Sequence, residues 1–151
     1  MTRLGSLMAT GILLCAAACT RFYGLEPLEP GVGRPSHYKK VDSLQPTLAW
    51  RAAPEPGARY DLVICPSESA TIRVGHTGTP GDAVYYREGI EHTSHRVETP
   101  LAPRTKYLWS VRVRTGQGVS DWSTYNYMHG GRIGDQYLEE HLPYRFCTPD
   151  Q

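Results

Sequence analysis

Residues 106–115, KYLWSVRVRT, carry the pattern that most constrains the fold of this chain. Successive side chains of a β-strand point to opposite faces of its sheet. One face of this strand would hold Tyr107, Trp109, Val111 and Val113, and the other Lys106, Leu108, Ser110, Arg112 and Arg114. The pattern therefore predicts a strand with one buried face and one mostly solvated face, which is typical of antiparallel sheets.

Six further segments have the composition of short strands. They are rich in β-branched and aromatic residues and are separated by Pro, Gly and Ser. The segments are TLAW (47–50), RYDLVIC (59–65), ATIRV (70–74), AVYYREG (83–89), HRVET (95–99) and YRFCT (144–148). The sequence has no helical period of comparable length. An all-β chain with antiparallel sheets is therefore predicted.

A short apolar segment follows Arg3, and residues 4–18 contain no charged side chain. A basic residue, an apolar run and then small residues are typical of a secretory signal peptide. The run is shorter than the ~17–20 residues that a membrane-spanning helix needs. Residues 1–18 are therefore predicted to be a signal peptide. A short buried helix, or an ordinary signal peptide that contains cysteine by chance, is the alternative.

Residues 16–19, Ala-Ala-Ala-Cys, resemble the bacterial lipobox, in which a small residue precedes a cysteine that is lipidated before cleavage. Cys15 fits less well, because Leu14 stands where the motif has Gly, Ala or Ser. Ala16 departs from the Leu that is commonest at its position. The resemblance implies that Cys19 is acylated and holds the protein on the lipid bilayer. Thr20 is not the Asp that favours inner-membrane retention in enterobacteria, so the outer membrane is favoured.

Proline and glycine are dense in residues 19–43, which are predicted to form an extended tether. Residues 44–151 are enough for one domain with a core of its own. The whole chain holds 16 Lys and Arg against 15 Asp and Glu, and no basic run. Nucleic acid is therefore not an expected partner.

Residues 101–113, LAPRTKYLWSVRV, resemble the Leu-x-Pro-x-Thr-x-Tyr signature of fibronectin type III domains. In that family the tyrosine packs inward and its hydroxyl bonds to nearby backbone. Residues 54–57 (PEPG) and 120–123 (SDWS) also match the family in order, so the resemblance covers about residues 44–149. It implies a fibronectin type III or immunoglobulin-like β-sandwich. The structural residues would be Trp50, Tyr60, Leu101, Pro103, Tyr107, Trp109 and Trp122.

The sequence departs from this family at residues 124–143, a long insertion before the last strand. Loops of this length are uncommon and often functional. The insertion mixes aromatic with adaptable polar groups, which suits recognition. The candidate binding residues are Tyr125, Tyr127, His129, Arg132 and Tyr137. A surface insertion without a function, with one helical turn near residues 135–142, is the alternative.

Cys65 and Cys147 are the remaining cysteines. An oxidising compartment favours a disulfide between them. The family's topology places their strands on either side of the 106–115 strand, so their backbones would lie about 9–10 Å apart, beyond the ~7 Å limit for a bridge. Each follows an inward residue, Ile64 or Phe146. Two outward-facing thiols are expected, and a disulfide only if the strand ends bend together.

No catalytic, metal or cofactor site is predicted. His92 and His95 would point to opposite faces of a strand, and the sequence has no nucleophile elbow, phosphate loop or zinc signature. The expected function is a non-catalytic binding or scaffold module whose partner is an envelope protein or glycan. The alternative is an accessory subunit or enzyme with a polar site in the insertion, formed by His129, Asp135, Glu139 and His141. A purely structural lipoprotein is a third reading.

Overall fold

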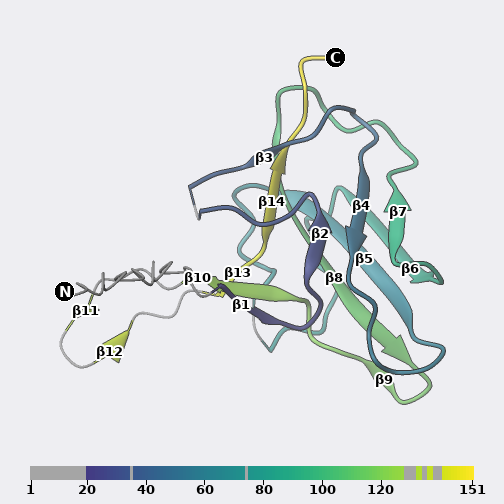
Figure 1. The fold of residues 1–151 in the computed structure, drawn as a ribbon. Helices are drawn as coiled ribbons and strands as arrows, with labels where there is room; N and C mark the ends of the chain where they lie inside the picture. The colour runs from purple at the N-terminus through teal and green to yellow at the C-terminus, as the bar shows by residue number, and fades with distance from the viewer. Residues whose placement is uncertain (1–19, 35, 74, 128–131, 134–135, 138–140) are drawn as a thin grey trace, which may run out of the picture.

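The computed structural model describes residues 20–34, 36–73, 75–127, 132–133, 136–137 and 141–151, and within them every regular element is a β-strand. The all-β prediction is therefore confirmed for this part of the chain (Figure 1). The strands are β1 (Thr20–Tyr23), β2 (Pro27–Glu29), β3 (Lys39–Lys40), β4 (Thr47–Trp50), β5 (Arg59–Pro66), β6 (Tyr85–Ile90), β7 (Ser94–Arg96), β8 (Lys106–Thr115), β9 (Gly118–Val119), β10 (Thr124–Tyr127), β11 (Arg132–Ile133), β12 (Gln136–Tyr137), β13 (His141–Leu142) and β14 (Tyr144–Cys147).

The largest sheet has the order β3-β14-β8-β5-β6, with β9 paired to β8. The predicted 106–115 strand is β8, which lies between β14 and β5 and pairs antiparallel with both. The predicted 47–50 strand is β4, with the same bounds. It belongs to a second sheet, β2-β4-β7. Strands β5 and β8 form the centre of the large sheet. They pair antiparallel over their length, from Arg59 opposite Arg114 to Pro66 opposite Tyr107.

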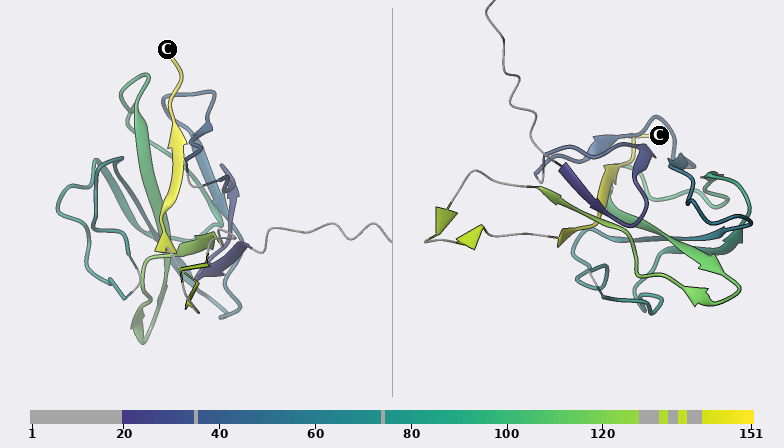
Figure 2. Two further views of the ribbon diagram at one scale, coloured as in Figure 1. Left: turned by 90° about the vertical axis from the view of Figure 1, so that its left-hand side faces the viewer. Right: turned by 60° about the horizontal axis from the view of Figure 1, so that its bottom comes forward.

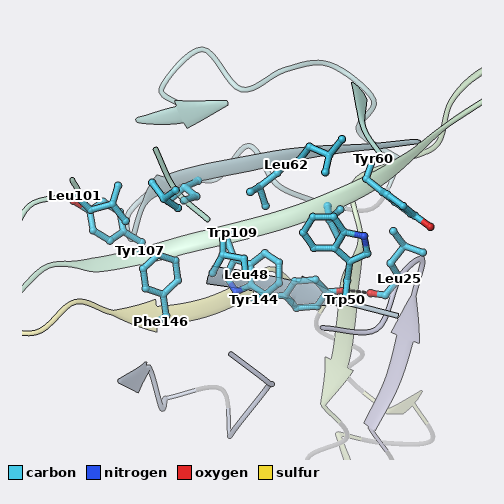
Figure 3. Close-up of a cluster of buried hydrophobic side chains, with 14 of the residues drawn as sticks. Leu25, Leu48, Trp50, Tyr60, Leu62, Leu101, Tyr107, Trp109, Tyr144 and Phe146 are labelled. Atoms are coloured by element: carbon cyan, nitrogen blue, oxygen red, sulfur yellow. Dashed lines mark hydrogen bonds between the residues drawn. The ribbon is translucent and has the colours of Figure 1, made fainter. Parts of the chain in front are cut away.

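The main core lies between the large sheet and the β2-β4-β7 sheet (Figures 2 and 3). Large aromatic side chains meet there edge to face, Trp50 with Tyr60 across the two sheets and Trp109 with Tyr144 within the large sheet. The ring centroids of Trp50 and Tyr60 are 5.5 Å apart, and those of Trp109 and Tyr144 are 5.0 Å apart. Edge-to-face pairs of this kind add to the stabilisation from apolar burial. Two sheets that enclose one core in this way are consistent with a β-sandwich.

The segment predicted to be a tether is instead part of the folded domain. Strands β1, β2 and β3 each join a different sheet. Leu25 is buried in the main core, its N–H donates to Ser123 Oγ at 2.8 Å, and its carbonyl accepts from the Tyr144 hydroxyl. The prediction was wrong because backbone pairing and scattered apolar residues hold the segment without a repeating pattern. Phe22, Val32 and Val41 pack against the same core as Leu25. The first described residues, Thr20–Tyr23, therefore already belong to the fold.

Gly24 explains how the chain turns between β1 and Leu25. Its φ of 96° is a conformation that L side chains rarely adopt, and a Cβ there would lie 2.4 Å from Ser123 Oγ. Only glycine therefore allows the close approach that brings Leu25 N–H to Ser123. Gly24 contributed to the glycine content that predicted a tether, but in the structure the packing of Leu25 against Ser123 requires it.

The predicted strand at 70–74 is not a strand in its described part, residues 70–73. Residues 67–73 and 75–84, called the outer loop below, cross the outer face of the large sheet and bury Ile72 against it. Local hydrogen bonds replace a strand ladder, among them Ser69 N–H to the Pro66 carbonyl at 3.0 Å and Thr71 Oγ1 to Asp82 at 3.0 Å. Side chains that bond to nearby groups in this way compete with sheet formation.

The face of β8 expected to be mostly solvated is largely buried, which corrects the sequence prediction. Leu108, Ser110 and Arg112 are 3%, 0% and 4% exposed. The outer loop and Trp122 cover them, and Trp122 is fixed by a hydrogen bond from its Nε1 to the Gly78 carbonyl at 2.7 Å. A second, smaller core therefore lies on the outer face of the large sheet.

The two described cysteines, Cys65 and Cys147, are free thiols on strands that flank β8. Cys65 lies opposite Leu108, and Cys147 lies opposite Lys106. Cys65 is buried in the second core, and this burial, together with the Asp82 carboxylate, raises the pKa of its thiol to about 11. A thiol with such a pKa is almost entirely protonated and unreactive near neutral pH. Cys147 is half-buried.

Candidate functional site

The insertion is anchored by a small three-stranded sheet, β1-β10-β13. Thr20 to Tyr23 of β1 lie opposite Tyr127 to Thr124 of β10, and Asn126 lies opposite His141 of β13. Farther out, β11 and β12 pair with each other. The described residues of the predicted helical turn, 136–137 and 141–142, are strands, so that prediction was wrong for them.

Tyr125, predicted as a binding residue, belongs to the main core. It is 1% exposed, its ring stacks on Tyr144 at a centroid distance of 6.2 Å, and its hydroxyl donates to the Gly33 carbonyl at 3.4 Å. A residue buried this completely cannot form part of a contact surface. Successive side chains of β10 alternate between the two faces of the small sheet. Tyr125 points toward the main core, and Thr124 and Asn126 therefore point to the other face.

The other candidate binding residues lie at the edge of the described structure. Tyr127 ends β10 opposite Thr20, while Arg132 and Tyr137 are opposite each other in the β11–β12 pair. His129 lies outside the described residues, as do Asp135 and Glu139 of the alternative polar site. His141, the remaining member of that site, packs edge to face against Tyr23 with centroids 4.4 Å apart.

A polar floor, formed by Thr124, Asn126 and His141, lies at the base of the insertion, on the face of the small sheet opposite the one that carries Tyr125. Asn126 is 2% exposed, and its Oδ1 has no hydrogen-bond partner. Thr124 Oγ1 and His141 Nδ1 are likewise buried and unpartnered. Buried polar atoms are nearly always hydrogen-bonded, so this floor has capacity for further hydrogen bonds. The alternation in TYNY (124–127) was the sequence signal that could have found it.

Most of the structural residues expected from the fibronectin resemblance are buried, namely Trp50, Tyr60, Leu101, Tyr107, Trp109 and Trp122. Pro103 is exposed. The Tyr107 hydroxyl accepts a hydrogen bond from Ala102 N–H at 3.1 Å. The Tyr60 hydroxyl accepts from Ala53 N–H at 3.1 Å. Each tyrosine thus combines an inward ring with a hydroxyl that fixes a neighbouring loop.

A buried charge cluster lies on the outer face of the large sheet, and sequence reasoning missed it. The Asp61 carboxylate accepts from Arg112 Nε at 2.9 Å, from Arg114 Nη2 at 2.8 Å and from Gly89 N–H at 3.0 Å. Burial alone would raise the pKa of the Asp61 carboxyl, but the bonds from Arg114, Gly89 and Arg112 outweigh it and lower the pKa. Asp61 is therefore held in its ionised form, and its hydrogen bonds join β5 to β6 and β8.

The described residues contain no group of three or more His, Cys, Asp or Glu side chains that could hold a metal ion. Nor does any helix among them have the length and apolarity to span a membrane.

Comparison of the chain with protein-family models, with curated proteins and with solved structures found no match. The function is therefore argued from the residues and their geometry.

Proposed function

We propose that this chain is a lipid-anchored module of the bacterial cell envelope, with a fibronectin type III-like β-sandwich and a non-catalytic binding or scaffold role. Cys19 carries the acyl chains, and the outer membrane is the favoured location. The partner is an envelope protein or glycan that the 124–143 insertion contacts. The two tyrosine hydroxyls that bond to loop backbone, Tyr107 and Tyr60, support the finer assignment of the sandwich.

The single observation that carries this proposal is that Thr20, the residue directly after Cys19, already belongs to a paired strand, β1. An acylated Cys19 would then be joined to the folded domain without a tether. Thr20 lies opposite Tyr127, the last residue of β10, so the insertion leaves the domain beside the anchor. Any partner of the insertion must therefore reach the surface of the membrane, which favours another envelope component.

The anchor is tested by intact mass and membrane fractionation of the protein expressed in a bacterium, with Cys19→Ala as the comparison. We expect a lipid-sized mass increment and membrane association in the wild type, and loss of both in the variant. Cys15→Ala is the matched control and keeps both properties. A soluble wild type without the increment would refute the anchor.

The insertion is tested by a replacement that the strand register makes simple. Asn126 and His141 are register partners, so substituting residues 127–140 by Asn-Gly closes a two-residue hairpin. We expect the thermal transition to stay nearly unchanged, while crosslinking to an envelope partner is lost. Undiminished crosslinking by the shortened protein would assign partner binding to another surface.

A further inference from the structure

Five cations from separate parts of the chain gather around Tyr38 at the β3 edge of the large sheet. This basic patch consists of Arg34, Lys39, Lys40, Lys106 and Arg145. Its members come from the 31–38 connection, β3, β8 and β14, which explains why no basic run marks it in the sequence. Parallel pairing of β3 with β14 places Lys40 beside Cys147, and Cys147 is opposite Lys106.

Two of these cations lie against the ring of Tyr38. The Lys106 Nζ lies 5.1 Å from the centroid of the Tyr38 ring, and the Arg145 Cζ lies 5.7 Å from the same centroid. Within the described residues, none of the five cations forms an ion pair. Like charges that share a ring without a counter-ion repel each other, and an external anion would relieve that repulsion.

The patch is open and shallow rather than enclosed. Arg34, Lys39 and Lys40 line a hollow of about 330 Å³ with Tyr38. Lys40 and Lys106 line a neighbouring hollow of about 440 Å³, which also holds Asp150 in an ion pair with Arg104. The carboxylates of Glu29 and Asp42 border the next hollow beyond Lys40, which ends the patch. Cations spread over an open surface suit an array of anionic groups better than one small anion.

The patch also lies near the start of β1. The Tyr125 hydroxyl bonds to the carbonyl of Gly33, which precedes Arg34, and Tyr125 is opposite Phe22. Thr20 is two residues from Phe22, about 7 Å along the strand. In Figure 1 the turn between β2 and β3 extends to the same side of the molecule as the paired ends of β1 and β10. An anchor at Cys19 would therefore attach the bilayer on the side of the domain that carries Arg34. This matters because attraction between exposed charges is largely screened beyond about 10 Å at 0.1 M salt.

We propose that the basic patch binds the anionic phospholipid headgroups of the membrane to which the protein is anchored. This inference rests on the proposed lipid anchor for its physiological setting. Acyl chains alone allow a domain to rotate about its attachment point. Contact between the patch and headgroup phosphates fixes which side of the domain faces the bilayer, and so fixes where the insertion is presented.

The test uses residues 20–151, which contain every described strand and both cores. This soluble form is sedimented with phosphatidylcholine vesicles and with vesicles that also contain phosphatidylglycerol, in low and high salt. We expect binding only to the anionic vesicles, with a steep loss in salt. Each Lys or Arg near such a surface is worth roughly five-fold in affinity. Lys39→Gln/Lys40→Gln should therefore weaken binding about 25-fold.

Arg73→Gln/Arg87→Gln is the control, because it removes the same charge from exposed positions on the outer loop and β6. It should keep most of the affinity, and Lys106→Gln is a second patch variant if the first does not fold. Cys147 lines the patch and supplies another readout, since anionic vesicles should slow its alkylation.

Equal losses in patch and control variants, or no vesicle binding in low salt, would overturn the inference. Displacement of the protein from vesicles by soluble polyphosphate at matched phosphate concentration would assign the patch to a free polyanion instead, and would also overturn it. Binding of residues 20–151 to vesicles does not require Cys19. A protein that binds anionic vesicles but is never acylated would thus refute the proposed anchor and leave this inference standing.

Discussion

The inner and outer faces of the large sheet are both buried, but different forces close them. On the inner face, Leu62, Trp109 and Phe146 meet a second sheet through apolar and aromatic contacts. On the outer face, Asp61, Ser110 and Arg112 are equally inaccessible to water, and a loop rather than a sheet covers them. The same strands, β5 and β8, supply both faces.

The outer face depends on directional bonds. Arg112 links Asp61 to the outer loop, because its guanidinium also donates to the Thr77 carbonyl and lies 4.4 Å from the Trp122 ring. Ser110 Oγ donates to the Ser123 carbonyl at 2.7 Å. Burial of charge is tolerated only when each group is paired. The central part of the outer face can therefore be buried although it is polar, because Asp61, Ser110 and Arg112 each have hydrogen-bond partners.

Trp50→Ala should give the largest effect, because it empties the inner face where the two sheets meet. A buried tryptophan replaced by alanine costs about 3–5 kcal/mol of unfolding free energy. Chemical denaturation measures the change. Trp122→Ala on the outer face is the matched comparison, and we expect it to cost less because a loop can close over the space. A tolerated Trp50→Ala would contradict the inner face as the main core.

Asp61→Asn should come second and should affect the outer face selectively. It leaves the buried Arg112 without its carboxylate, which costs about 2–3 kcal/mol. The local readout is alkylation of Cys65 in a Cys147→Ser background, because Cys65 is buried beneath the outer loop. We expect faster alkylation in the variant well below the midpoint of unfolding. Unchanged alkylation together with unchanged stability would show that the charge cluster does not hold the loop.

Tyr107→Phe removes the hydroxyl that accepts from Ala102 N–H and leaves the ring in place. The expected loss is about 1–2 kcal/mol, since a part-buried backbone donor loses its partner. Tyr23→Phe is the control, because that tyrosine lies in the small sheet and contacts His141 through its ring. Equal stability of Tyr107→Phe and the wild type would argue against a tyrosine corner.

The smallest expected effect is a pH dependence specific to the outer face. The pKa of Asp61 is lower in the folded protein than its ordinary value near 4. Its contribution to stability is therefore complete above about pH 4 and is lost as the pH falls through the folded pKa. The unfolding free energy of the wild type should fall more steeply below pH 4 than that of Asp61→Asn. Parallel pH profiles would contradict the lowered pKa.

The apolar patterns of β4, β5, β8 and β14 were sufficient to predict those strands, because alternation and aromatic content report directly on a face that meets a core. The charged residues of the same strands were misread. Arg112 and Arg114 looked solvated, since a sequence cannot show that Asp61, about fifty positions earlier, lies beside them. Tyr125 was misread for the related reason that an aromatic residue in an insertion can face either way.

By itself, therefore, the sequence determined an all-β chain and the strands of the inner core, and the resemblance to fibronectin type III domains added the flanking of β8 by β5 and β14. Only the tertiary structure decided that residues 20–43 join the sheets, that the outer loop buries the second face, and that five dispersed cations meet around Tyr38. The physical reason is the separation along the chain of the residues that each feature depends on. Alternation is a local property of a strand, whereas edge pairing, loop coverage and charge clustering depend on groups that folding brings together from distant parts of the chain.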